Sequence, residues 1–153
     1  MELIDFLKKD LLFTGVEVES DEEIIRFLGG KLVGLGYVEP DYVDAVWQRE
    51  TEYPTGIENS GYNFAITHAE GGAVHSPAVA LAVLKKPVEF HRIDDPDSLT
   101  SVRLVLMLAI IEPDEQVMAL RKLMKKLQSP KLFEAIYASE DQEDLFRTIN
   151  AEG

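Results

Sequence analysis

The longest apolar run in the chain, residues 102–111, constrains its fold more than any other feature. From Val102 to Ile111 every position except Arg103 is apolar. A strand with one face in water alternates apolar and polar residues, whereas a strand buried on both faces is a nearly continuous apolar run. The unbroken part, Leu104 to Ile111, is far too short to cross a bilayer. We therefore expect a strand with other elements packed on both of its faces.

Shorter apolar segments and amphipathic helices accompany this strand along the chain. Further strands are expected at residues 11–18, 64–66, 79–84 and 88–90, with a turn at Lys85-Lys86-Pro87. Helices are expected after Ser20, which forms a capping box with Glu23, and from Pro40, Pro113, Pro130 and around Leu145. Buried strands interspersed with amphipathic helices indicate a layered α/β fold, and the length suits one domain, residues 1–153.

Composition excludes several classes of function. The chain has no cysteine, which rules out disulfides, thiolate metal sites and a cysteine nucleophile. Its formal charge of −13 argues against binding nucleic acid or anionic membrane surfaces. The charge either suits a partner protein with a basic patch or only keeps the chain in solution. No apolar signal segment is visible near Lys8 and Lys9, so we expect a cytoplasmic protein without direct membrane insertion.

A histidine at the end of a short strand is the main candidate for chemistry. Phe64, Ala65 and Ile66 lead through Thr67 to His68, and a glycine-containing loop follows at 70–72. Such a position holds an imidazole on a rigid sheet beside a loop, which suits nucleophilic or proton-transfer work. The alternative is a histidine that only closes the strand with a hydrogen bond.

Metal and cofactor sites are not expected. His68 and His75 are seven residues apart and lack the compact spacing of a zinc site, and His91 is expected at a solvated strand end. The chain has neither a Gly-x-Gly-x-x-Gly motif after a strand nor a Walker motif nor a Gly-x-Ser-x-Gly elbow. A candidate nucleophile without a nucleotide site fits a histidine that accepts a phosphoryl group from another protein.

Arg49 is the matching candidate for charge stabilisation. It lies near the end of the second expected helix, shortly before the turn at 53–56. A guanidinium fits phosphoryl oxygens through two parallel hydrogen bonds. The alternative is a cation at a helix end that pairs with Glu50 or Glu52.

These segments, in this order, resemble a known family. They are Arg49-Glu50, Tyr53-Pro54-Thr55-Gly56, Phe64-Ala65-Ile66-Thr67-His68, residues 77–84 and Pro87-Val88-Glu89-Phe90. Their order is similar to that in the enzyme IIA component of the phosphoenolpyruvate-dependent sugar phosphotransferase system. The resemblance is to the fructose/mannitol superfamily and, within it, to the galactitol-type branch.

The resemblance implies a mixed central sheet flanked by helices. It also implies that His68 receives a phosphoryl group from the histidine-containing phosphocarrier protein and passes it to a cysteine of a cognate enzyme IIB, which serves a membrane enzyme IIC. Arg49 would match the arginine that neutralises the phosphoryl group. The turn at Thr55 and Gly56 would shape the rim of the site and bind the phosphoryl group.

The chain departs from the family pattern at three positions. Thr67 replaces the usual proline before the active histidine, and we expect its hydroxyl to take part in the site. Gln116 stands where some members have a second histidine, and His75 lies two residues beyond the place, Ala73, of a loop histidine in the galactitol branch. Both are expected to contact the phosphoryl group. These departures leave open a regulatory module of the same fold, whose partner affinity phosphorylation of His68 would switch.

Overall fold

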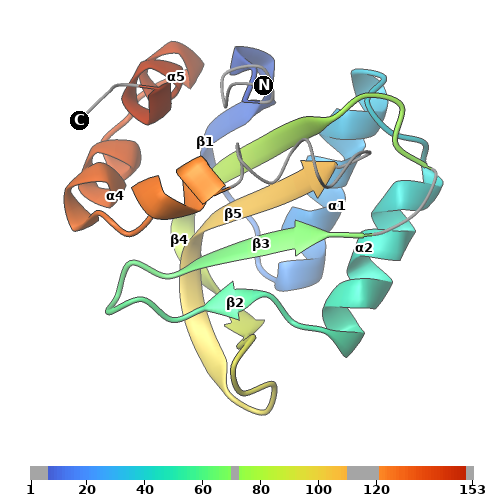
Figure 1. The fold of residues 1–153 in the computed structure, drawn as a ribbon, viewed down its shortest axis with the longest axis horizontal. Coiled ribbons are helices and arrows are strands. Elements are labelled where there is room, and N and C mark those ends of the chain that lie inside the picture. The colour runs from blue at the N-terminus through green and yellow to red at the C-terminus, as the bar shows by residue number, and fades with distance from the viewer. Residues whose placement is uncertain (1–6, 70–72, 110–120, 151–153) are drawn as a thin grey trace.

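The sheet of this protein is mixed, with the order β1-β4-β5-β3-β2 (Figure 1). The computed structural model describes residues 7–69, 73–109 and 121–150. β1 is parallel to β4 and β3 is parallel to β5, whereas the β4–β5 and β2–β3 pairs are antiparallel. The strands are β1 Leu12–Val16, β2 Gly56–Ile57, β3 Phe64–His68, β4 Ala78–His91 and β5 Leu99–Ala109.

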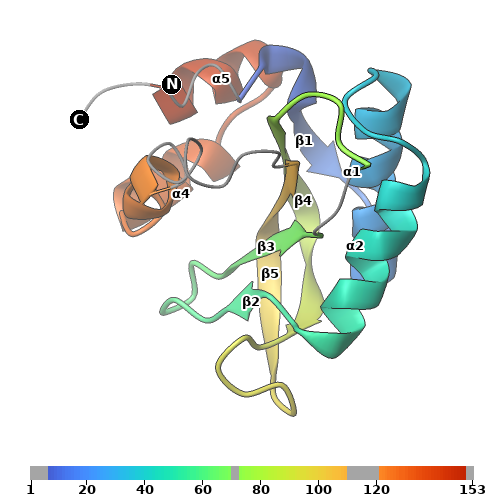
Figure 2. The ribbon, with the colours of Figure 1, turned by 45° about the vertical axis from the view of Figure 1, so that its right-hand side comes forward.

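Helices cover both faces of this sheet. α1 and α2 lie on one side of it and α4 and α5 on the other, as Figures 1 and 2 show together. The bounds of the helices are η2 Lys9–Leu11, α1 Asp21–Gly34, α2 Asp41–Glu52, α4 Pro130–Tyr137 and α5 Gln142–Asn150. Within the described ranges, none of the helices combines the length and apolar character that a membrane span requires. The predicted mixed sheet flanked by helices is confirmed.

The apolar run at 102–109 forms the centre of the sheet, as predicted. Its side chains alternate between the two cores: Val105 and Met107 pack with α1 and α2, whereas Leu104 and Leu106 pack with α4 and α5. All four are fully buried. Each face therefore has its own apolar core, and β5 stabilises both. Residues 110 and 111 of the run lie outside the described residues.

The predicted turn at Lys85-Lys86-Pro87 is wrong, because β4 continues through it. Val83 pairs with Leu104 and Val88 with Val102, so residues 84–87 stand opposite Arg103 alone. A β-bulge of this kind accepts a proline because the ladder is already interrupted there. The two lysines point to water and pair with Glu17 and Glu19 beyond β1.

The helix that will matter for the site, α2, is held closely against α1. The glycine at position 29 of α1 faces Val43, and a Cβ atom there would lie 2.7 Å from Val43 Cγ2. Only glycine permits this approach without displacing Val43. Ser20 caps α1 by accepting a hydrogen bond from the Glu23 amide, as the sequence predicted.

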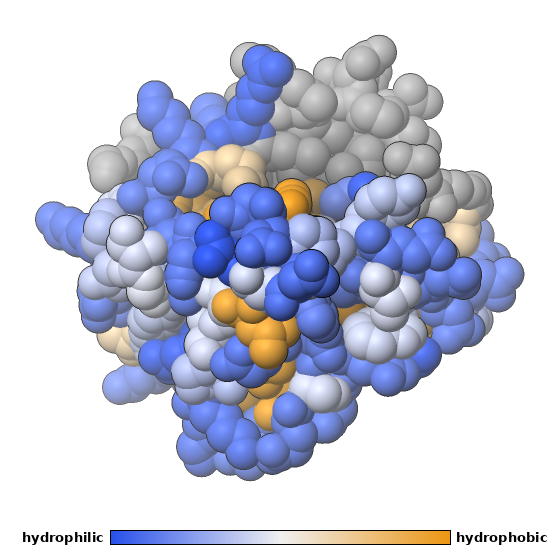
Figure 3. Space-filling view, turned by 90° about the horizontal axis from the view of Figure 1, so that it is seen from below, coloured by the Kyte–Doolittle hydropathy of each residue, from blue (hydrophilic) through white to orange (hydrophobic). Residues whose placement is uncertain are grey.

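The surface at the β4–β5 turn is mostly hydrophilic, with apolar side chains gathered in a small central area (Figure 3). Among the large apolar residues exposed in the described part of the chain, Ile93 and Leu99 belong to this connection. It lies at the opposite end of β5 from the pairing of His68 with Leu108. This end of the molecule is therefore remote from the candidate nucleophile.

Candidate active site

His68 is the last residue of β3, at an edge of the sheet where two strands end together. β3 and β5 are parallel, and His68 pairs with Leu108 close to the end of β5. The carboxyl ends of neighbouring parallel strands form a common edge, which is where α/β sheets place their ligands. The side chain of His68 is partly exposed. The strand-end position predicted from the sequence is confirmed.

The backbone selects the tautomer of His68. Its Nδ1 atom lies 3.0 Å from the carbonyl oxygen of Ile66. Because a carbonyl oxygen only accepts hydrogen bonds, Nδ1 carries the proton and the lone pair of the neutral ring is on Nε2. The acceptor that orients the ring, which the sequence did not reveal, is therefore the backbone two residues earlier. A nucleophilic attack by the neutral ring would therefore come from Nε2.

Arg49 lines a cleft at the end of β3. This cleft has a volume of about 270 Å³. Its lining residues are Ala45, Gln48, Arg49, Glu52 and Tyr53 of α2 and its C-terminus, together with Ala69. Ala69 directly follows His68, so the cleft joins the arginine to the strand end that carries the histidine. The Arg49 guanidinium carbon also lies 5.3 Å from the centre of the Tyr53 ring, a cation–π contact.

The buried Nε atom of Arg49 has no hydrogen-bond partner within residues 7–69, 73–109 and 121–150. An N–H group that is buried and unpaired costs free energy, which an anionic ligand in the cleft would recover. Of the two alternative partners that the sequence offered, Glu50 directs both carboxylate oxygens to Thr55, and Glu52 lines the same cleft as Arg49. The Nε donor of Arg49 is therefore available to a ligand in the cleft.

The carboxylate of Glu50 holds the turn that follows α2. Its Oε2 accepts the Thr55 amide at 2.9 Å and its Oε1 accepts the Thr55 hydroxyl at 2.8 Å. Glu50 is only 5% exposed, and this burial raises the pKa of its carboxyl against the opposing effect of the two hydrogen bonds. The Thr55 groups that we expected to bind a phosphoryl oxygen are thus committed to Glu50. The sequence signal for this link is only the spacing from Glu50 to the Thr55-Gly56 turn.

Gly56 has a packing role in the structure. A Cβ atom at this position would lie 2.6 Å from the carbonyl oxygen of His91, and the Gly56 carbonyl accepts the Ile93 amide at 2.8 Å. β2 begins here and pairs with β3 at Ala65, three residues before His68. The glycine therefore admits the β4–β5 connection to the edge of the sheet and offers no group to a ligand.

Thr67 does not present its hydroxyl to the cleft. The side chain is fully buried, and its Oγ1 donates to the Leu106 carbonyl at 2.7 Å. Side chains alternate along a strand, so Thr67 points to the opposite face from His68. Its place in the structure argues against the direct contact that we expected, and it favours a role in fixing β3 on β5.

Of the remaining predicted contacts, His75 is engaged away from His68, and the one at Gln116 stays a prediction. The His75 ring is exposed and its Nε2 lies 2.9 Å from Glu39 Oε1, near the connection between α1 and α2. His91 lies at the far end of β4 and its Nδ1 is 2.8 Å from the Pro96 carbonyl oxygen. Gln116 falls outside the described residues. Within those residues, no three acidic or histidine side chains are grouped as a metal site would require.

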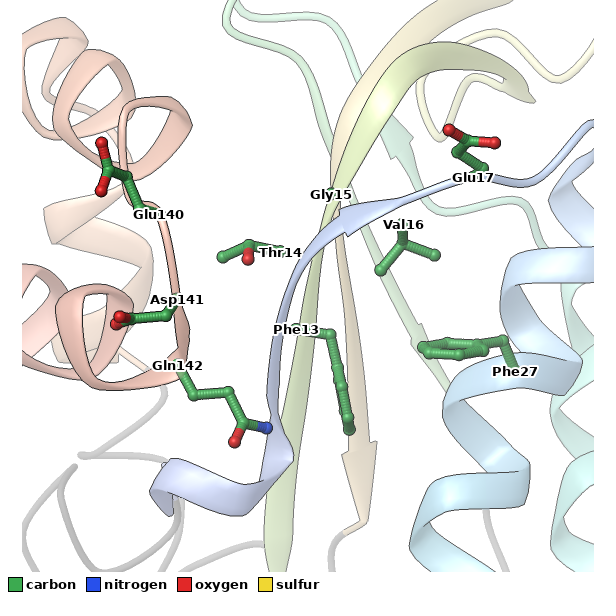
Figure 4. A pocket seen from close by; sticks show the side chains of 9 residues that line it. All are labelled: Phe13, Thr14, Gly15, Val16, Glu17, Phe27, Glu140, Asp141 and Gln142. Carbon is green, nitrogen blue, oxygen red and sulfur yellow. The ribbon is translucent and has the colours of Figure 1, made fainter.

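A larger hollow lies beside β1, which is an outer strand of the sheet (Figure 4). It has a volume of about 530 Å³ and is bordered by α1 and by the residues before α5. Phe13 and Phe27 meet edge to face on one side, and Glu140 and Asp141 line the other. Its lining contains neither histidine nor arginine, so it does not compete with the cleft at Arg49 as a site for phosphoryl chemistry.

Comparison with known proteins agrees with this arrangement. Residues 5–152 match the family model described as "Phosphoenolpyruvate-dependent sugar phosphotransferase system, EIIA 2". The chain belongs to this family. EIIA proteins are phosphotransferases with a phosphohistidine intermediate, so the chain is a phosphocarrier of a sugar phosphotransferase system. The resemblance read from the sequence is thereby confirmed.

Three relatives define the similarity of this EIIA chain. The galactitol-specific EIIA component of Escherichia coli K12 is 32% identical over 125 residues, which cover 80% of this chain and 81% of the relative. The mannitol-specific EIICBA component of Vibrio cholerae is 30% identical over 146 residues, 94% of this chain and 21% of the relative. A solved complex of the mannitol enzyme IIA with phosphorylated enzyme IIB from Escherichia coli aligns with a TM-score of 0.76 and 25% identity, and covers 94% of this chain and 98% of that one.

Proposed function

We propose that His68 takes a phosphoryl group from the histidine-containing phosphocarrier protein and passes it to a cysteine of a cognate enzyme IIB. The enzyme IIB would in turn serve a membrane enzyme IIC that imports a galactitol-like sugar into the cytoplasm. One observation carries the proposal: His68, with its tautomer set by Ile66, stands at the end of β3 beside the cleft of Arg49. The similarity to a galactitol-specific EIIA component supports the sugar class.

The transfer needs a neutral imidazole as nucleophile. Nε2 of His68 attacks phosphorus in line, and a new N–P bond forms while the N–P bond to the donor histidine breaks. The donor ring keeps the bonding electron pair, and the proton of His68 stays on Nδ1, which donates it in a hydrogen bond to the Ile66 carbonyl. In the second step a thiolate of enzyme IIB attacks the same phosphorus, and Nε2 recovers its lone pair as the leaving group.

Arg49 would stabilise the charge that moves during both steps. The phosphoryl group carries negative charge on three oxygens, and a guanidinium meets two of them with parallel N–H groups. The buried Nε, which lacks a partner in the described structure, is one of these donors. Glu50, the next residue in sequence, directs both carboxylate oxygens to Thr55 and not to this guanidinium.

Labelling with phosphoenolpyruvate, enzyme I and the phosphocarrier protein tests the nucleophile. We expect one phosphoryl group per chain, labile in acid and stable in base, and its loss in His68→Ala. His75→Ala and His91→Ala are matched controls, since each removes a histidine engaged elsewhere on the surface. Full labelling of His68→Ala would overturn the proposal.

A second experiment separates the carrier from a regulatory module of the same fold. The phosphorylated chain is mixed with the enzyme IIB encoded nearest to it, and transfer to the IIB cysteine is followed by mass. A carrier loses its phosphoryl group to enzyme IIB at a catalytically useful rate. A regulatory module retains it and instead changes its affinity for a partner protein.

A further inference from the structure

A tyrosine hydroxyl joins α2 to the two strands that end at the active-site edge. Tyr42 lies in the first turn of α2 and is 1% exposed. Its hydroxyl donates to the carbonyl oxygen of Leu108 and accepts the amide of Ala69 at 3.3 Å. Leu108 is the register partner of His68, and Ala69 is the next residue after it. One oxygen atom therefore contacts both the residue that follows His68 in the chain and the residue that pairs with His68 in β5.

The same helix carries Arg49, seven residues after Tyr42. Seven residues make almost two turns of an α-helix, so both side chains project from the same face of α2. Ala69, which donates to the Tyr42 hydroxyl, also lines the cleft of Arg49. The position of the arginine relative to the histidine thus depends on how α2 is attached at this point.

We propose that Tyr42 is a positioning residue for phosphoryl transfer, which sets the distance between the His68 ring and the Arg49 guanidinium by fixing α2 to the ends of β3 and β5. This inference rests on the proposed function of His68. Phosphoryl transfer depends on such placement, since a shift of about 1 Å costs on the order of a hundred-fold in rate.

The chemistry of the residue suits a permanent link. Burial raises the pKa of the Tyr42 hydroxyl to about 12, so it remains protonated at neutral pH and both of its hydrogen bonds persist. A phenylalanine would fill the same space and leave the Ala69 amide and the Leu108 carbonyl without this partner. α2 would still be held against α1 by the Gly29–Val43 contact. Loss of the hydroxyl should therefore loosen the site while the helix stays in place.

The test compares Tyr42→Phe with the wild type in single-turnover transfer from the phosphorylated phosphocarrier protein. We expect the rate constant at saturation to fall by at least about ten-fold, with the half-saturating concentration of the donor unchanged within roughly two-fold. Tyr62→Phe is the matched control, because it removes a tyrosine hydroxyl bonded to Glu134 on the other side of the sheet. That control should transfer at the wild-type rate.

A double-mutant cycle separates positioning from a purely structural role. If Tyr42 acts through Arg49, the ten-fold loss should largely vanish when Tyr42→Phe is made in an Arg49→Ala background. An equal loss in both backgrounds, or a folded Tyr42→Phe variant with the wild-type rate, would overturn the inference. Absence of labelling on His68 of the wild type would instead overturn the proposed function.

A measurement on the wild type keeps the inference testable if Tyr42→Phe does not fold. Phosphorylation of His68 should shift the ring resonances of Tyr42 in an NMR spectrum, since the Tyr42 hydroxyl bonds to Leu108 and Ala69, which both adjoin His68. The ring resonances of Tyr62 should stay in place. Unshifted Tyr42 resonances on full phosphorylation would count against the link.

Discussion

Replacement of Thr67 by valine tests whether its hydroxyl belongs to the chemistry or to the sheet. Valine keeps the branched shape and removes only the hydroxyl, which donates to the Leu106 carbonyl at 2.7 Å in a fully buried position. The net contribution of such a hydrogen bond is about 1 kcal/mol. β5 lies between β3 and β4, so the Leu106 carbonyl remains inside a hydrogen-bonded sheet, and the loss should not exceed this figure by much.

For a chain of this length, about 1 kcal/mol corresponds to a fall in melting temperature of roughly 2–4 °C. The rate of phosphoryl transfer should change by less than about two-fold, because the hydroxyl is engaged with the Leu106 carbonyl and Thr67 does not line the cleft. Thr67→Ser is the matched control: it keeps the hydroxyl and loses a buried methyl group, at a cost of about 0.8 kcal/mol. The two variants thus have similar stability and differ in the hydroxyl.

Calorimetry and single-turnover transfer at the same temperature measure both effects. A fall in transfer rate of ten-fold or more in Thr67→Val, with Thr67→Ser at the wild-type rate, would show that the hydroxyl contacts the phosphoryl group. Our placement of Thr67 in the sheet would then be wrong.

Three further changes probe the residues around the cleft. Arg49→Lys keeps the charge and loses the planar fork, so transfer should slow by about ten-fold, or about 1.4 kcal/mol, without a change in urea unfolding; an unchanged rate would return Arg49 to the role of a helix-end cation. Burial raises the pKa of Glu50 in the folded chain, so the contribution of Glu50 to stability is largest at low pH and is lost as the pH rises. The free energy of unfolding of the wild type, relative to that of Glu50→Gln, should therefore be larger at about pH 5 than at pH 7. The opposite trend would contradict the burial argument. Gly56→Ala places a methyl group 2.6 Å from the His91 carbonyl and should lower the free energy of unfolding by about 1–3 kcal/mol, whereas a variant as stable as wild type would show that the β4–β5 connection moves aside.

Patterns within one segment of the sequence correctly predicted the features that depend on neighbouring residues alone. The apolar run around Leu106 became the central strand, and Ser20 became a helix cap through its own hydroxyl. The prediction at Pro87 was wrong because two lysines and a proline are typical of a turn. The β-bulge that accommodates them depends on the pairing of β4 with β5 around Arg103. Patterns within one segment do not reveal which distant strand will lie alongside.

The candidate site shows the same division. His68 at a strand end and Arg49 near a helix end followed from neighbouring residues. The structure places Arg49 in a cleft that is also lined by Ala69, the residue after His68. The hydroxyl groups of Thr67 and Tyr42 donate to carbonyl oxygens on β5, far away in sequence. The residues around each hydroxyl in the sequence therefore could not predict its hydrogen-bond partner. Tyr42 in particular was indistinguishable from an ordinary core residue of α2.

His68 and Arg49, the two main residues of the proposed site, belong to opposite sides of the sheet. His68 shares its strand face with Phe64, which packs with α4 and α5, whereas Arg49 comes from a helix on the opposite side. They approach each other only past the edge formed by β3 and β5, strands whose pairing joins distant parts of the chain. Such non-local pairings form late in folding. We therefore expect the proposed site to be complete only after β3 has paired with β5.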